Sequence, residues 1–357
     1  MVTIQTLLEE MVLRGATDLH LLAGAPPYFR IDQELVPLEY NVLTPAMTRS
    51  LVYSLLNDQQ KKRLEEEMEL DFAISLEGLS RFRGNAYIQR GSVACAIRRI
   101  PFEIPALQEL GLPDVVETIT QKTQGFILVT GPTGSGKSTT LAAMINKIND
   151  ERACHIVTIE DPIEYLHKNK MAIVSQREVG QDTKSFAQAL KFVLRQDPDI
   201  IMIGELRDLE TVSAALTAAE TGHLVFATLH TDSAIESINR IIDIYPPHQQ
   251  GQVRVQLSQV LEAVITQRLL PRAKGKGMVL ASEVMIATPA VRTLIRESRV
   301  HEIYGVLQTS QRFGMRTMNM SLFDLFKKGL ITWQTALLVS PNPEELKRMG
   351  KEVGVLM

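Results

Sequence analysis

A glycine-rich stretch near the middle of the chain carries residue types that bind phosphate. It fits the P-loop pattern, in which two glycines separated by four residues precede Lys137 and Ser138. In such a loop the backbone N–H groups converge on phosphate oxygens, the lysine reaches the β- and γ-phosphates, and the serine holds Mg²⁺. The pattern therefore predicts a site for ATP or ADP with Mg²⁺. The predicted nucleotide-binding residues are Gly131, Pro132, Thr133, Gly134, Ser135, Gly136, Lys137, Ser138 and Thr139.

Carboxylates follow two further apolar runs. Glu205 comes two residues after the run 200–203, where a P-loop enzyme needs a group that orients the attacking water, and we predict that it is the catalytic base. Glu160, Asp161 and Glu164 follow 156–159 and suit a site for Mg²⁺ and water. We predict these three and Ser138 as metal ligands, and Glu164 also as catalytic. Spacing alone does not say which acid faces the metal.

Histidines and arginines complete the candidate site. His230 ends a third predicted strand, 224–228, and is predicted to sense the γ-phosphate or orient water, whereas His223 begins that strand. An arginine that neutralises charge on the transferred phosphoryl group raises the rate by ~10³–10⁵. The candidates are Arg195, Arg207 and Arg240 in the core, and Arg81, Arg83, Arg98 and Arg99 nearer the N-terminus.

The elements that position these residues fall into two parts. Residues 1–100 have the mixed helix and strand pattern of a small α+β domain, and prolines punctuate a linker over 101–115. From 116 to 357, short apolar runs alternate with helical patterns around the P-loop, which predicts an α/β domain with a largely parallel sheet. From about residue 248 onward the pattern predicts helices.

Composition limits the class of protein. At 357 residues with a net charge of −3 and a pI of about 6.2, the chain has no global basic field for nucleic acid. Cys95 and Cys154 are far apart, which fits a reducing cytosol. Glu9 and Glu10 lie where a signal peptide needs apolar residues, and no run is long enough for a transmembrane segment. We expect a cytoplasmic protein whose links to a membrane depend on partners.

Four motifs in order resemble those of the secretion ATPases that drive type II secretion and type IV pili. After the P-loop, 160–164 resembles the Asp box of that family, 194–208 its Walker B region, and 219–231 its His box. The resemblance implies a homo-hexameric ring of subunits, each with a PAS-like N-terminal domain and a RecA-like ATPase domain. It also implies that N-terminal arginines reach the nucleotide, and Arg83 and Arg98 match these by motif position.

Within this family the chain resembles the pilus retraction ATPases. It lacks the longer N-terminal region and the tetracysteine motif of the extension ATPases, and 290–297 resembles the AIRNLIRE motif of the retraction ATPases, with Val291 for Ile and Thr293 for Asn. On its own, this segment is an amphipathic helix with Val291, Leu294 and Ile295 on one face. The resemblance implies an inner-membrane platform protein as partner and pilus disassembly as the work done.

Other functions remain open at this point. An extension or secretion ATPase of the same family would share the four motifs. A RecA-like nucleic-acid translocase would need basic and aromatic pore residues, yet aromatic residues make up only 5% of the chain. A small-molecule kinase would need an acceptor pocket and a lid, for which there is no motif. An ABC-type ATPase is disfavoured because 257–260 lacks the glycine pair of the ABC signature.

Overall fold

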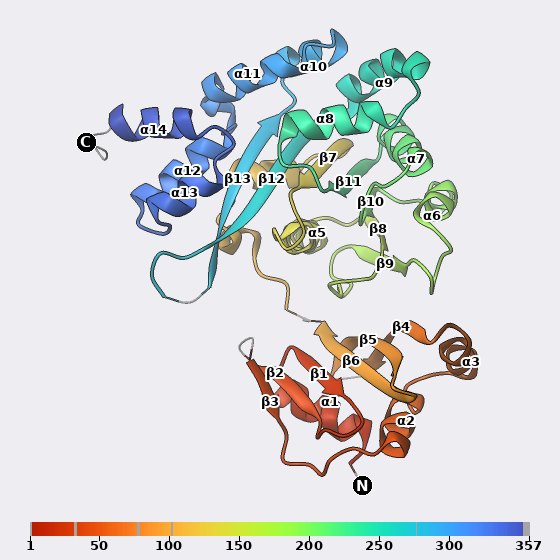
Figure 1. Cartoon of the computed structure of the whole chain (residues 1–357). Coiled ribbons are helices and arrows are strands. Elements are labelled where there is room, and N and C mark those ends of the chain that lie inside the picture. Colours follow the sequence, from red (N-terminus) through yellow and green to blue (C-terminus); the bar gives the residue numbers. More distant parts are fainter. Residues whose placement is uncertain (1, 32–33, 77–78, 101–102, 276, 353–357) are drawn as a thin grey trace. The chain divides into compact units, whose positions relative to one another are not determined.

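A computed structural model of the chain describes residues 2–31, 34–76, 79–100, 103–275 and 277–352 (Figure 1). The chain divides into two compact units, Met1–Glu103 and Ile104–Met357. Of the predicted linker, 101–102 lie outside the described residues, and a short 3₁₀ helix occupies Leu107–Leu110. The predicted α/β class is confirmed, with an antiparallel sheet in the first unit and a mostly parallel sheet in the second.

The first unit is an antiparallel sheet with helices on one face. Strand order is β3-β2-β1-β6-β5-β4. Alternate residues such as Leu19, Phe29 and Phe82 are buried against the helices, while the residues between them lie on the other face. The elements are α1 (Ile4–Leu13), β1 (Asp18–Leu21), β2 (Tyr28–Ile31), β3 (Glu34–Pro37), α2 (Pro45–Tyr53), α3 (Asp58–Glu67), β4 (Glu69–Leu76), β5 (Ser80–Gln89) and β6 (Ser92–Ile100).

The second unit contains a sheet with the order β13-β12-β7-β11-β10-β8-β9, parallel except for β13. The predicted apolar runs 156–159, 200–203 and 224–228 form three of its central strands, and they are buried because helices cover both faces of the sheet. The strands are β7 (Gly125–Thr130), β8 (His155–Glu160), β9 (Ile173–Glu178), β10 (Ile200–Ile203), β11 (Leu224–Leu229), β12 (Leu261–Pro271) and β13 (Met278–Ile286).

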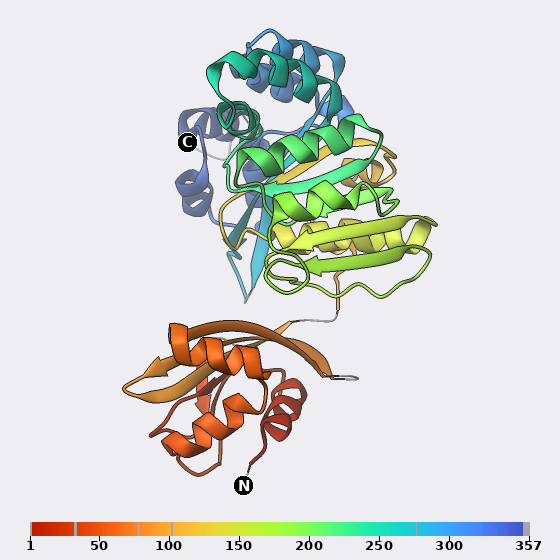
Figure 2. The same ribbon diagram turned by 90° about the vertical axis from the view of Figure 1, so that its right-hand side faces the viewer.

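The helices of this unit form layers on the two faces of the sheet (Figures 1 and 2). One face packs against α6 (Phe186–Val193), α7 (Leu209–Glu220), α8 (Ala234–Asp243), α9 (Pro247–Val260), α10 (Pro289–Arg296) and α11 (Ile303–Thr309). The other packs against α4 (Val115–Thr120) and α5 (Lys137–Glu151). The remaining helices, α12 (Met318–Lys327), α13 (Trp333–Val339) and α14 (Pro343–Glu352), pack with β12 and β13 around a separate core.

The prediction that the chain is helical from about residue 248 was wrong for β12 and β13. These strands form a long antiparallel hairpin, drawn as the cyan and blue arrows in Figure 1. β12 also pairs in parallel with β7 from Phe126 to Thr130, so it extends the sheet beside the P-loop strand. The run from Leu261 to Ile265 is apolar at nearly every position, and periodicity alone does not distinguish a buried strand of this kind from a buried helix.

The predicted amphipathic helix at 290–297 is confirmed as α10. Val291, Leu294 and Ile295 are buried in the core. Arg292 donates from Nη1 to the carbonyl oxygens of Ser258 (3.0 Å) and Gln259 (2.7 Å), at the end of α9. Arg292 therefore links α10 to the end of α9.

Candidate nucleotide site

The P-loop joins the end of β7 to the start of α5, as the sequence predicts. Gly136 caps the helix with a φ of 89°, and Gly131 has a φ of 138°. A Cβ on Gly131 would lie 2.3 Å from the carbonyl oxygen of Gln267 and 2.7 Å from Oγ of Ser135. Only glycine fits both the backbone conformation and the space at this position.

Gly131→Ala is expected to abolish nucleotide binding, because the methyl group must push β12 away from the loop. A fluorescent ATP analogue titrated into the variant measures this. Gly111→Ala is the matched control, since Gly111 also has a positive φ of 73° but nothing within 4 Å of the added Cβ. The control should lose only about 1–2 kcal/mol of stability and still bind nucleotide. Unchanged binding by Gly131→Ala would contradict this account of the loop.

The side chains of the loop are arranged for an anion. Lys137 is 9% exposed, and its Nζ donates to the carbonyl oxygens of Gly131 (2.8 Å) and Pro132 (3.0 Å). Burial lowers its pKa, and the carboxylates of Glu205 and Glu164 oppose that shift. The buried hydroxyl of Ser135 has no hydrogen-bond partner among the described residues. A buried cation and an unpartnered hydroxyl beside a helix N-terminus fit a phosphate group.

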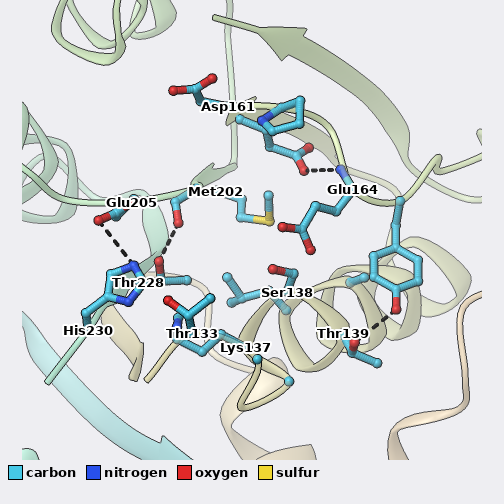
Figure 3. A pocket seen from close by; sticks show the side chains of 18 of the residues that line it. Thr133, Lys137, Ser138, Thr139, Asp161, Glu164, Met202, Glu205, Thr228 and His230 are labelled. Carbon is cyan, nitrogen blue, oxygen red and sulfur yellow. Dashed lines mark hydrogen bonds and ion pairs between the residues drawn. The ribbon is translucent and has the colours of Figure 1, made fainter. Parts of the chain in front are cut away.

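A cavity of about 430 Å³ opens at the loop, over the carboxyl ends of the parallel strands. Figure 3 shows residues from the loop, the predicted Asp box, and the ends of β10 and β11 around this space. The predicted site residues that line it are Thr133, Gly134, Gly136, Lys137, Ser138, Thr139, Glu160, Asp161, Glu164, Glu205, Arg207 and His230.

The three carboxylates after β8 differ in their surroundings. Glu160 is buried and accepts from the Thr158 hydroxyl (2.6 Å) and from Nε2 of Gln176 (3.2 Å). The carboxylate of Asp161 lies 3.7 Å from Nη1 of Arg207. In Figure 3 the carboxylate of Glu164 points toward Ser138, whereas that of Asp161 points away. Glu164 and Ser138 are therefore the predicted metal ligands that face each other.

No cluster of three or more His, Cys, Asp or Glu side chains suited to a metal ion occurs in the described part of the chain. This is compatible with Mg²⁺, which keeps several waters and takes substrate phosphates as ligands.

Burial raises the pKa of Glu160 from 4.5 to about 7, and this predicts a pH dependence of stability. Between about pH 4.5 and 7 the folded protein holds a proton that the unfolded chain has released. The contribution of Glu160 to stability therefore falls as the pH rises through this window, by roughly 3 kcal/mol in total, and is level above it. Glu160→Gln should remove this contribution, so the difference in unfolding free energy between the two proteins should change with pH. Urea unfolding of both nucleotide-free proteins at several pH values between 4.5 and 8 measures their free energies of unfolding. The same pH dependence of this free energy in both proteins would contradict the prediction.

Glu205 follows β10 and forms a cluster with two basic side chains. Its Oε2 accepts from Nε of Arg207 (2.9 Å) and forms an ion pair with Nη2 of the same guanidinium (2.8 Å), and its Oε1 lies 3.3 Å from Nε2 of His230. The Glu205 side chain is 23% exposed, so it is accessible from the cavity. The Thr228 hydroxyl donates to the carbonyl oxygen of Gly204 and ties β11 to the turn that carries Glu205. The cluster can orient a water and accept its proton.

Several candidates lie elsewhere. Arg83 on β5 and Arg98 on β6 belong to the first unit. The described residues that line the cavity do not include Arg195, Arg240 or His223. His223 instead contacts the carbonyl oxygen of Ala218 through Nδ1 (2.9 Å), at the end of the sheet where β11 begins.

Tyr165 and Gln176 are among the polar residues of the site that were missed from the sequence. The Tyr165 hydroxyl hydrogen-bonds to Oγ1 of Thr139 (2.9 Å), which ties the loop after β8 to α5. Gln176 on β9 donates both to Glu160 and to the carbonyl oxygen of Tyr165 (2.8 Å). Neither residue stands in a recognisable motif, and β9 itself has no clear apolar alternation, so the sequence carries no signal for them.

No helix among the described residues has the length and apolar character needed to cross a bilayer.

Comparison with known proteins gives a consistent result. Residues 1–301 match the family described as Type II/IV secretion system protein. The type IV pilus retraction ATPase PilT of Pseudomonas aeruginosa is 47% identical over 93% of this chain and 96% of its own length. A twitching motility protein of Neisseria gonorrhoeae is 45% identical over 91% of this chain and 87% of its own.

A solved structure extends the similarity to the fold. The crystal structure of the pilus retraction motor PilT with bound ADP superposes with a TM-score of 0.93, at 52% identity, over 98% of this chain and 100% of that one. The predicted family and its ATPase activity are thereby confirmed. The chain belongs to the type II/IV secretion system protein family, among its pilus retraction ATPases.

Proposed function

We propose that the chain is a ring motor that hydrolyses ATP to power retraction of type IV pili and twitching motility. It works as a cytoplasmic homo-hexamer that docks on the inner-membrane platform protein of the pilus machine, without contacting nucleic acid. The observation that carries the proposal is the convergence of Lys137, Glu164 and Glu205 on one cavity, in a chain similar over nearly its whole length to retraction ATPases.

The residues around the cavity have separate roles in this proposal. The loop amides and Lys137 bind the phosphates, and Nζ of Lys137 exchanges two carbonyl partners for phosphate oxygens. Ser138 and Glu164 would hold Mg²⁺, with Asp161 and Glu160 supporting the loop, and a bound ion would supply positive charge against the phosphates. Glu205 takes a proton from the attacking water, and His230 orients Glu205 and that water.

Arg83 and Arg98 supply positive charge from the first unit. Phosphate charge attracts them only when that unit closes on the nucleotide, so ATP binding favours closure and hydrolysis with release favours opening. Successive closure around the ring would turn the platform protein and disassemble the pilus.

Glu205→Ala in the native host tests the direction of the motor. Surface pili counted by electron microscopy should increase while surface motility is lost, because disassembly stops and assembly continues. Bald cells would overturn retraction and favour an extension or secretion ATPase of the same family. Unchanged pili would overturn a main role in the pilus machine.

A further inference from the structure

Four charged residues lie in one row across the sheet of the first unit. Antiparallel register places Arg83 on β5 opposite Arg98 on β6, Arg98 opposite Asp18 on β1, and Asp18 opposite Arg30 on β2. The row lies on the face that alternates with the buried residues Leu19, Phe29, Phe82 and Ile97. It is thus on the side of the sheet away from its helices.

Asp18 is the single acid in this row of three arginines. Like charges directly opposite each other destabilise a sheet, so a carboxylate next to Arg98 offsets its repulsion with Arg83. The Asp18 side chain is only 10% exposed, and it accepts from the Thr17 hydroxyl (2.8 Å) and from Nε of Arg98 (2.7 Å). Nε of Arg30 lies 3.9 Å away. These two hydrogen bonds restrain the position of the Asp18 carboxylate.

The contact between Asp18 and Arg98 uses one end of the guanidinium. Nε faces Asp18, whereas the Nη atoms form no hydrogen bond or ion pair within the described residues, and the side chain is 71% exposed. A guanidinium has five N–H donors in a fixed fork, so a bond at Nε leaves four of them directed outward. Fixing Nε also reduces the rotamer freedom that would be lost when these donors bind an anion.

We infer that Asp18 is a positioning residue, which holds Arg98 through Nε so that its two terminal nitrogens are presented to a phosphate. The inference rests on the proposed role of Arg98 at the nucleotide. Asp18 itself does not touch the nucleotide, and its effect passes entirely through Arg98.

Steady-state ATP turnover by the full-length protein tests the inference. Asp18→Asn should lower kcat/KM by about 10–100-fold, because an arginine that is free to rotate is misplaced for much of the time. Asp71→Asn is the matched control. Asp71 lies on the same face, accepts from Nδ2 of Asn85 (3.1 Å) and pairs with no arginine among the residues that the structure describes, so this variant should keep its activity.

The double variant separates positioning from a general structural effect. If Asp18 acts through Arg98, Asp18→Asn should have no further effect on kcat/KM in an Arg98→Ala background. Equal fractional losses in both backgrounds, or full activity of Asp18→Asn alone, would overturn the inference. If Arg98→Ala itself leaves turnover unchanged, the proposed role of Arg98 fails instead.

A second variant covers the case in which Asp18→Asn does not fold. Arg98→Lys keeps the charge, but an ammonium group cannot bond to Asp18 through Nε and present a separate fork. Its kcat/KM should fall by about as much as that of Asp18→Asn, with the thermal unfolding midpoint unchanged. Full activity of Arg98→Lys would also overturn the inference.

Discussion

Glu205→Gln is expected to lower kcat for ATP hydrolysis by about 10²–10⁴, which is the typical contribution of a general base. Glutamine keeps the size of the side chain and an oxygen for Arg207, but it cannot take a proton from water. Nucleotide binding should persist, because in the proposed arrangement Lys137 and the loop amides hold the phosphates independently of Glu205. Phosphate release measures kcat, and titration with a fluorescent ATP analogue measures affinity.

The control for this prediction is Glu210→Gln. Glu210 is an exposed acid five residues further along, in the first turn of α7, so its loss changes the net charge equally but leaves the cavity intact. Glu210→Gln should hydrolyse ATP at the original rate. If Glu205→Gln also retains full turnover, the base lies elsewhere, and Glu164 becomes the acid to replace next.

The core of the site could be predicted because it depends on short stretches of sequence. The P-loop, its strand and its helix are contiguous. Glu205 comes one glycine after β10, an apolar strand that lies next but one to β7 in the sheet. In a parallel sheet the carboxyl ends of the strands meet at one edge, so residues that follow such strands lie near each other. This rule brings Glu160, Glu205 and His230 to one cavity without any knowledge of the loops.

The remaining details depend on contacts between distant segments. Spacing could not distinguish Glu160 from Glu164, because the difference arises from Thr158 and from Gln176 on β9, which surround Glu160 and bury it. The hairpin of β12 and β13 was missed for a similar reason. Its apolar run has no period that favours a strand, and pairing with β7 decides its conformation.

The placement of Arg83 and Arg98 on one face of the first sheet depends on the local sequence pattern and also on contacts between distant segments. Period-two alternation predicts that Arg81 and Arg83 share a face of β5. It cannot predict that Arg98 lies directly opposite Arg83, because register between strands depends on the turn and on the burial of neighbouring residues. The sequence therefore indicates that β5 is basic, and the structure shows that Arg83 and Arg98 lie side by side in one row across the sheet.

Arg83→Ala and Arg98→Ala are each expected to lower kcat by up to about 10³–10⁵, the effect of removing an arginine that neutralises the transferred phosphoryl group. Both side chains are exposed on the first unit. Among the described residues, Arg83 has no anionic partner and Arg98 has only Asp18, so their charge is available to a ligand. In the proposed function the two arginines act on closure of the first unit as well as on the reacting phosphate. Both variants should therefore also lose affinity for ATP more than for ADP. Turnover and the two affinities measure this.

Arg63→Ala is the matched control for these two variants. Arg63 is an exposed arginine of the same unit, on α3, and its Nε pairs with Glu67 (2.8 Å). Its removal leaves Arg83 and Arg98 in place, so turnover should be unchanged. Full turnover by both Arg83→Ala and Arg98→Ala would mean that the first unit supplies no charge to the reaction. ATP binding would then have no electrostatic reason to favour closure of the two units, and the proposed coupling of hydrolysis to movement would be wrong.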